Sequence, residues 1–201
     1  MKIINIYISK LGNINENLIS KEFLNRVNTY GSSKARIESL SGRSLINEVL
    51  AEKGIKNPHF VHNKFGKPYL SDNAFYFNLS HSYDYLALVI ADQEIGVDIE
   101  LIDFKAARVK RRFTTKTTTQ NEADFYTKLW VLKEGFMKWL GVGLTIPLKE
   151  IMINEIDSYK DLYSVSYKEE ITTCKVVKYE DYYIGVCLNN IEDYSLKIEV
   201  R

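Results

Sequence analysis

The fold is decided by two short stretches of sequence, Phe77-Asn78-Leu79-Ser80-His81-Ser82 and Gly96-Val97-Asp98-Ile99-Glu100. The second stretch alternates like a strand, with apolar residues on one side and Gly96, Asp98 and Glu100 on the other. Two carboxylates beside a glycine suit a hard divalent cation such as magnesium, which takes oxygen ligands. The same pattern is typical of the solvated face of an antiparallel sheet, so the pair alone leaves both interpretations open.

Composition limits the class of protein. The 201 residues are 45% hydrophobic, enough for one domain or for two small domains packed together. The net charge of +1 argues against a protein that coats nucleic acid. The sequence shows neither a signal peptide nor an apolar run long enough to cross a membrane. Cys174 and Cys187 lack metal-ligand spacing and are interpreted as free thiols in the core, so we expect a reducing, cytoplasmic location.

Hydrophobic periodicity predicts a mixture of helices and strands. The expected helices cover 16–27, 33–53, 104–113 and 122–140. The expected strands cover 2–9, 69–70, 75–79, 85–91 and 95–100, with further strands across 148–199. Between the last two helices, the stretch from Thr114 to Gln120 is rich in threonine and is predicted to be a mobile surface loop.

A faint internal repeat indicates how these elements are organised. Residues 83–89 resemble residues 180–186, and a similar offset relates the helix at 33–53 to the helix at 122–140. The predicted fold is α+β, a pseudo-dimer of two similar helix-plus-antiparallel-sheet halves, residues 1–100 and 101–201. A site between the halves would draw on both of them.

The helix predicted at 122–140 has two different faces. Its apolar stripe consists of Phe125, Leu129, Leu132, Phe136 and Trp139. Trp130, Glu134 and Lys138 are spaced by four and share the opposite face. A Glu134–Lys138 pair alone would be an ordinary solvated helix surface. Trp130 on that face indicates that something covers it, which favours a site containing a third carboxylate and a lysine.

Ser80, His81 and Ser82 are predicted to follow the strand at 75–79. At a strand end, such hydroxyl and imidazole groups can donate hydrogen bonds to phosphate oxygens. A surface turn explains them equally well. A nucleophilic serine with a histidine base is disfavoured, since adjacent residues rarely reach each other and no orienting acid is evident.

Six motifs then occur in order along residues 33–150. They are Gly66-Lys67-Pro68, Phe77-Asn78-Leu79-Ser80-His81-Ser82, Gly96-Val97-Asp98-Ile99-Glu100, Leu129-Trp130-x-x-Lys133-Glu134, Lys138, and Gly141-x-Gly143-Leu144. Together they resemble the 4′-phosphopantetheinyl transferases of the long, monomeric type that activates peptide and polyketide synthases. The resemblance implies a pseudo-dimeric fold. It also implies transfer of the phosphopantetheine arm of coenzyme A to a serine of an apo acyl or peptidyl carrier protein, with release of adenosine 3′,5′-bisphosphate.

The resemblance also implies roles for individual residues. Asp98, Glu100 and Glu134 match magnesium ligands, and Glu134, Lys138 and His81 are the expected catalytic residues. The matching coenzyme A contacts are Lys67 and Pro68 near the adenine, Ser80 and His81 on phosphate, Lys138 on the pyrophosphate, Lys133 in the same motif, and Arg36 on the 3′-phosphate. No nucleic-acid or membrane partner is expected.

The chain departs from the family pattern at two places. Many relatives carry a glutamate shortly after the residues matching Arg112-Phe113, whereas this chain has threonines there, so the role of proton acceptor falls to Glu134. For the 3′-phosphate, a strict alignment on Gly42 places Glu38 at the arginine position, and Arg43 is a second candidate beside Arg36.

Three further expectations follow from the sequence. The basic stretch within 104–125 is a candidate docking surface for an acidic carrier protein. Two other functions stay open at this point. One is a coenzyme A or nucleotide-binding protein without catalysis, and the other is a metal-dependent phosphate-ester hydrolase using the same carboxylates.

Overall fold

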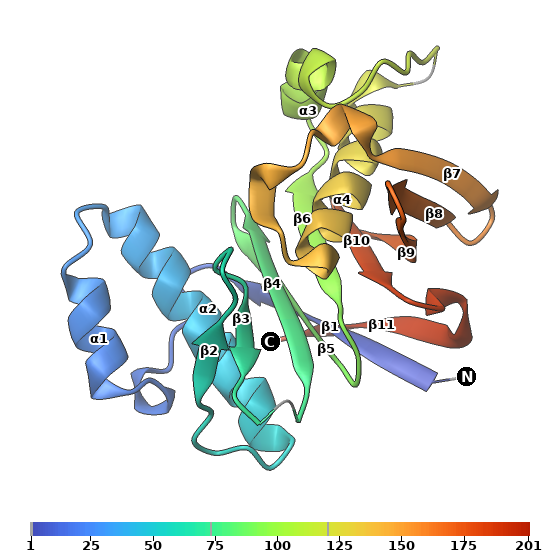
Figure 1. Cartoon of the computed structure of the whole chain (residues 1–201). Helices are drawn as coiled ribbons and strands as arrows, with labels where there is room; N and C mark the ends of the chain where they lie inside the picture. The colour runs from blue at the N-terminus through green and yellow to red at the C-terminus, as the bar shows by residue number, and fades with distance from the viewer. Residues whose placement is uncertain (1, 73, 120) are drawn as a thin grey trace.

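The computed structural model describes residues 2–72, 74–119 and 121–201 and shows an α+β protein with two main sheets (Figure 1). The first sheet has the strand order β11-β1-β5-β4, with β1 at Lys2–Lys10, β4 at Tyr76–Ser82, β5 at Tyr85–Ala91 and β11 at Tyr194–Val200. The second has the order β6-β10-β9-β8-β7, with β6 at Gly96–Leu101, β7 at Met152–Asp157, β8 at Leu162–Tyr167, β9 at Glu170–Tyr179 and β10 at Tyr182–Leu188. A separate hairpin joins β2 (Phe60–His62) to β3 (Pro68–Leu70).

The helices are α1 (Lys21–Asn28), α2 (Ser33–Glu52), α3 (Phe104–Val109) and α4 (Glu122–Leu140). Single 3₁₀ turns cover Glu16–Leu18, Lys110–Arg112, Gly143–Thr145, Leu148–Glu150 and Ile191–Asp193. The predicted helix at 16–27 is therefore two pieces, because Ser20 caps a new helix by accepting the N–H of Phe23. The predicted helix at 104–113 likewise ends at Val109 and continues as a 3₁₀ turn.

The helix predicted at 122–140 has these bounds in the structure. Asn121 caps its start by accepting the N–H of Ala123, and Gly141 ends it in the left-handed conformation at φ 71°. Strand β4 is longer than predicted and runs through Ser82, so Ser80, His81 and Ser82 lie within the strand and not after it. Of the predicted loop, Gln120 lies outside the described residues.

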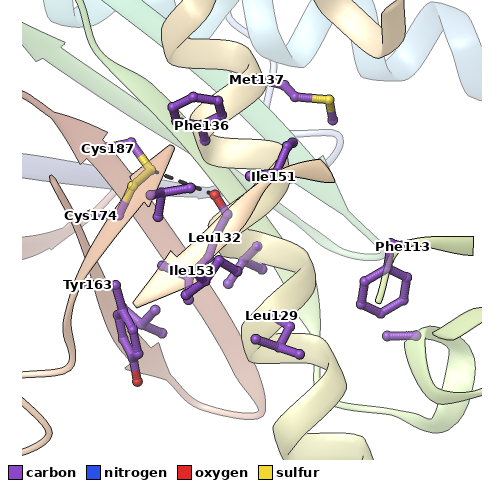
Figure 2. Close-up of a cluster of buried hydrophobic side chains, with 14 of the residues drawn as sticks. Phe113, Leu129, Leu132, Phe136, Met137, Ile151, Ile153, Tyr163, Cys174 and Cys187 are labelled. Atoms are coloured by element: carbon purple, nitrogen blue, oxygen red, sulfur yellow. Dashed lines mark hydrogen bonds between the residues drawn. A yellow bond between two sulfur atoms is a disulfide. The ribbon is translucent and has the colours of Figure 1, made fainter. Parts of the chain in front are cut away.

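Helix α4 packs unusually close to the second sheet because three glycines meet there. A Cβ atom on Gly185 would lie 2.6 Å from the carbonyl oxygen of Val131, and one on Gly96 would lie 2.1 Å from that of Gly135. Leu132 and Phe136 are fully buried against the same sheet (Figure 2). The close approach fixes the position of α4 over β6, and with it the position of Glu134 and Lys138 relative to that strand.

Cys174 and Cys187 lie directly opposite each other on β9 and β10 and form a disulfide (Figure 2). The prediction of free thiols is wrong, because a sequence pattern does not reveal which strands pair or in which register. Both residues are fully buried in the core beneath α4. Free thiols therefore no longer support the expectation of a reducing compartment.

Each main sheet combines strands from the first and the second half of the sequence. β11 pairs in parallel with β1, and β6 pairs antiparallel with β10. The pseudo-dimeric relationship and the division of the chain after residue 100 stay predictions. Among the described residues, no helix combines the length and apolar character needed to cross a membrane.

Candidate active site

The site lies where strands β4 and β6, the edges of two different sheets, come together. Among the described residues no backbone ladder joins these two strands, and alternate side chains of β4 make the hydrogen bonds to β6. The amide oxygen of Asn78 accepts the N–H of Val97 at 2.9 Å. Ser80 Oγ donates to Asp98 Oδ1 at 2.8 Å, and Ser82 Oγ donates to Glu100 Oε2 at 2.7 Å. The strand alternation of both segments thus aligns their polar faces.

A cavity of about 360 Å³ opens at this junction. Its lining residues are Leu79, Ser80, His81, Asp98, Glu100, Trp130, Glu134 and Lys138. They come from β4, β6 and the outward face of α4. The structure therefore brings together the three predicted metal ligands, the three predicted catalytic residues and Ser80.

Asp98 is the most buried carboxylate of the site, with 4% of its surface exposed. Its Oδ1 accepts from Lys138 Nζ at 2.7 Å in addition to Ser80. Lys138 Nζ also donates to Ser80 Oγ at 2.7 Å. The other carboxylate oxygen, Oδ2, is buried and has no hydrogen-bond partner. An unpaired buried carboxylate oxygen is costly, so this atom calls for a cationic or donor group in the cavity.

The pKa values of the two neighbouring glutamates are raised, as expected of crowded carboxylates. Burial raises the pKa of Glu134 to about 7, with the Asp98 charge adding to the effect. Burial also raises the pKa of Glu100, and the hydrogen bond from Ser82 opposes the shift. Without a cation between them, these groups disfavour one another's charge.

The residues fit a magnesium ion by their chemistry. Among residues 2–72, 74–119 and 121–201, no group of three His, Cys, Asp or Glu side chains is already gathered in metal-binding geometry. Three carboxylates nevertheless line one cavity, and one of them has an unpaired buried oxygen. Magnesium requires oxygen ligands of this kind and relies on substrate phosphates for part of its shell.

Trp130 is partly buried at the side of the cavity, and its ring meets the edge of the fully buried Phe113 at a centroid distance of 5.1 Å. His81 is the exposed member of the site, and its Nδ1 lies 3.7 Å from Oε1 of Glu38 on α2. One wall of the cavity is therefore aromatic, and the rim opposite carries an imidazole.

Four predicted coenzyme A contacts lie outside this cavity. Lys67 Nζ is held by Glu94 at 2.6 Å and by the carbonyl oxygens of Ile95 and Trp139, and Pro68 follows it in the same hairpin. Lys133 points into the core, where its Nζ donates to three backbone carbonyls. Arg36 is partly buried on α2 and lines none of the described cavities.

A second, basic cavity of about 600 Å³ lies between α1, α2 and the residues leading into β2. Its basic side chains are Arg26, Arg43, Lys56, His59 and His62. The guanidinium of Arg43 stacks on Phe23 at 4.4 Å and on Phe60 at 4.0 Å. Burial and the neighbouring Arg26 lower the Arg43 pKa to about 10. The sequence offers Arg43 only as an alternative contact for the 3′-phosphate, and no local pattern points to Arg26 or His62. The reason is that the residues around this cavity come from three separate segments.

Comparison with known proteins identifies the family of the chain. Residues 94–187 match the model of the 4′-phosphopantetheinyl transferase superfamily. The 4′-phosphopantetheinyl transferase ffp of Bacillus subtilis is 30% identical over 165 residues, covering 74% of this chain and 72% of that protein. The enzyme gsp of Aneurinibacillus migulanus is 27% identical over 198 residues, covering 91% and 83%. The mouse L-aminoadipate-semialdehyde dehydrogenase-phosphopantetheinyl transferase is 29% identical over 189 residues, covering 81% and 60%.

The structure has a carboxylate-lined cavity between two sheets, and the relatives of the chain are phosphopantetheinyl transferases. The chain belongs to the 4′-phosphopantetheinyl transferase family and is an enzyme of that class.

Proposed function

We propose that the protein transfers the 4′-phosphopantetheine arm of coenzyme A to a serine hydroxyl of an apo acyl or peptidyl carrier protein, with release of adenosine 3′,5′-bisphosphate. Enzymes of this family use coenzyme A as co-substrate and act on carrier proteins. The observation that carries the proposal is the unpaired, buried Oδ2 of Asp98 in a cavity shared with Glu100, Glu134 and Lys138. Three carboxylates and a lysine on one cavity suit a pyrophosphate and its counterion.

In the proposed reaction, Asp98, Glu100 and Glu134 would hold magnesium. The ion would neutralise pyrophosphate charge when bound. The serine oxygen attacks the phosphorus that carries the pantetheine arm, and the bond from that phosphorus to the bridging oxygen breaks. Glu134, which lines the cavity together with Asp98 and Glu100, accepts the serine proton.

Lys138 and His81 act on the leaving group. Lys138 Nζ lies within 2.7 Å of both Asp98 and Ser80, so it is already oriented into the cavity. Its ammonium stabilises the charge that develops on the departing bisphosphate. His81 is exposed at the rim, within reach of an oxygen of a bound phosphate. Ser80 contributes by positioning Asp98 and Lys138, because its hydroxyl is engaged by both.

We place the 3′-phosphate of coenzyme A in the basic cavity. The described residues give Arg43 aromatic neighbours but no carboxylate partner, and Arg26 lies close enough to depress its pKa. An anion between the two guanidinium groups would relieve that repulsion. Arg26 and Arg43 therefore replace Arg36 in the proposal. The predicted adenine contact would then fall to Pro68, since the ammonium and the backbone N–H of Lys67 are both already hydrogen-bonded.

The carrier protein docks, in this proposal, on the basic surface formed by residues 104–116 beside the cavity. α3 and the 3₁₀ turn after it carry Lys105, Arg108, Lys110, Arg111 and Arg112. The chain as a whole has a net charge of only +1, so this surface is a local concentration of positive charge. Such a surface would steer an acidic partner toward the site.

We further propose that the chain works as a monomer built from two related halves, residues 1–100 and 101–201. Each of the two main sheets carries one long helix, α2 or α4, and the cavity lies at the junction. A cytoplasmic location stays a prediction.

The test is incubation of the protein with coenzyme A, magnesium and a panel of apo carrier domains, followed by intact-mass spectrometry. A mass increase equal to one phosphopantetheine on a carrier serine, absent in the presence of EDTA, supports the proposal. Release of adenosine 3′,5′-bisphosphate without an acceptor would indicate a phosphate-ester hydrolase. Binding of coenzyme A with neither product would indicate a non-catalytic binding protein.

A further inference from the structure

Lys133 is the only lysine among the described residues that is classed as buried, with 4% of its surface exposed. It lies on α4 directly before Glu134, about 100° around the helix from it, and its side chain is buried in the core. Its Nζ donates to the carbonyl oxygens of Phe113 at 2.8 Å, Leu148 at 2.6 Å and Ile151 at 2.8 Å. An ammonium group has three donors, so all of them are used.

The three carbonyls come from two segments that are far apart in the sequence. Phe113 precedes the threonine-rich segment, Leu148 begins a 3₁₀ turn, and Ile151 precedes β7. Within the described part of the chain, no carboxylate forms an ion pair with Lys133. Its charge is balanced by carbonyl dipoles alone, which makes the exchange of any one carbonyl for water or apolar surface costly.

The Phe113 bond connects Lys133 to the active site. The ring of Phe113 is fully buried, and it contacts both Trp130 at 5.1 Å and Tyr126 at 6.4 Å. Trp130 lines the cavity that holds Glu134. The bond therefore fixes the aromatic wall of the cavity and, next to it, the C-terminal part of the 104–116 segment on which the carrier protein is proposed to dock.

We propose that Lys133 is a positioning residue that holds the 113–116 and 148–151 segments against α4, and that it makes no contact with coenzyme A. The inference deepens the proposed function and rests on it for its consequence, which is an effect on the carrier protein and not on coenzyme A. The placement of the ammonium itself rests only on the contacts given above.

The first test uses the wild-type protein and nuclear magnetic resonance of its ¹⁵N-labelled lysine ammonium groups. We expect the Lys133 signal to be protected from exchange with water and to keep its position when coenzyme A and magnesium are added. The signal of Lys138, which lies in the cavity, should move under the same conditions and serves as the positive control. A displacement of the Lys133 signal as large as that of Lys138 would overturn the proposal.

The second test compares Lys133→Met with Lys128→Met. Lys128 lies on the same helix and pairs with Asp161 at the surface at 2.7 Å, outside the cavity, so it is the matched control. In Lys133→Met, amide hydrogen exchange across 113–119 and 148–153 should accelerate by about tenfold or more, because the segments open locally. The KM for carrier protein should rise. The Kd for coenzyme A should stay within about twofold of the wild-type value, whereas loss of a direct contact worth about 1.4 kcal/mol would raise it about tenfold.

A tenfold loss of coenzyme A affinity with unchanged exchange would show direct ligand contact and reject the positioning role. If Lys133→Met does not fold, the ammonium signals of the wild-type protein decide between a positioning role and direct contact with coenzyme A. If the wild-type protein modifies no carrier domain, the proposed function fails, while hydrogen exchange still reports whether Lys133 holds these segments.

Discussion

The side-chain oxygen of Asn78 accepts the backbone N–H of Val97 at 2.9 Å, although the two residues lie on strands of different sheets. Both are buried. Ser80 and Ser82 of β4 make further hydrogen bonds to β6, and two of these orient Asp98 and Glu100. The geometry of the carboxylates therefore depends on a residue that does not touch the cavity.

Replacing Asn78 with Ala should destabilise the protein, because it leaves the buried N–H of Val97 unpaired. The expected cost is about 1–3 kcal/mol. Thermal unfolding should show a fall in Tm of roughly 2–4 °C for each kcal/mol. Asn154→Ala, at an exposed position of β7, is the control, and an equal effect of the two changes would contradict the argument.

Asp98→Asn should abolish magnesium-dependent transfer, with a loss of at least about 100-fold in kcat/KM, comparable to removal of a group that stabilises developing charge. The amide keeps the shape and can still accept from Lys138, so circular dichroism should show an unchanged fold. Asp124→Asn on α4, where the carboxylate accepts from the hydroxyl of Tyr183 at 2.9 Å, tests whether any carboxylate of this region has the same effect. Near-wild-type turnover of Asp98→Asn would reject the metal site.

Glu134→Gln should raise the stability of the metal-free protein at pH 8. The pKa of Glu134 is raised by burial from 4.5 to about 7, so between these values the folded protein binds a proton that the unfolded chain has released. Stability therefore falls as pH rises through this window, and the cost is fully present above pH 7.

The variant has no such cost, so its Tm should exceed that of the wild type at pH 8, by roughly 2–4 °C per kcal/mol of difference. The advantage should shrink toward zero below the unfolded pKa of 4.5. Magnesium should raise the Tm of the wild type more than that of the variant, because only the native site of the wild type offers three carboxylates. A pH-independent difference would contradict the assignment.

Arg26→Met should remove the preference for coenzyme A over 3′-dephospho-coenzyme A. A hydrogen bond to a charged group contributes about 1.5–3 kcal/mol, so the ratio of the two affinities should fall by about tenfold or more. Isothermal titration with both ligands measures it. Lys21→Met, an exposed basic residue on the same helix, should leave the ratio unchanged. Unchanged discrimination in Arg26→Met would place the 3′-phosphate elsewhere.

The double change Arg111→Glu and Arg112→Glu should raise the KM for carrier protein and leave that for coenzyme A nearly unchanged. Both residues lie on the 3₁₀ turn after α3 and outside the cavity. High salt should imitate the effect on the wild type, because it screens surface charge. An equal loss for both substrates would argue against docking on this surface.

Much of this arrangement is predictable from local signals. The alternation of Gly96, Asp98 and Glu100 with apolar residues predicts the strand and its polar face, since one side of β6 is fully buried. The cap at Asn121 and the left-handed Gly141 mark both ends of α4. The spacing of Trp130, Glu134 and Lys138 predicts that they share a face.

Other features depend on which segments meet, and no local pattern carries that information. Lys133 lies on the apolar side of α4, where a lysine is tolerated only because three carbonyls from elsewhere surround its ammonium. The Cys174–Cys187 pairing follows from the register of β9 and β10. Lys67 was expected at a ligand, whereas it meets the end of α4 through the carbonyl of Trp139.

The parallel pairing of β11 with β1 has a consequence for the order of synthesis. β1 precedes β11 in the sequence by the whole length between them, so the edge of β1 to which β11 pairs stays open until β11 has been synthesised. Arg201, the final residue of the sequence, then donates its backbone N–H to Ile8 and its guanidinium to Glu52 on α2. A polypeptide released prematurely lacks this closing strand and exposes an unpaired edge, which is a ready substrate for aggregation or proteolysis.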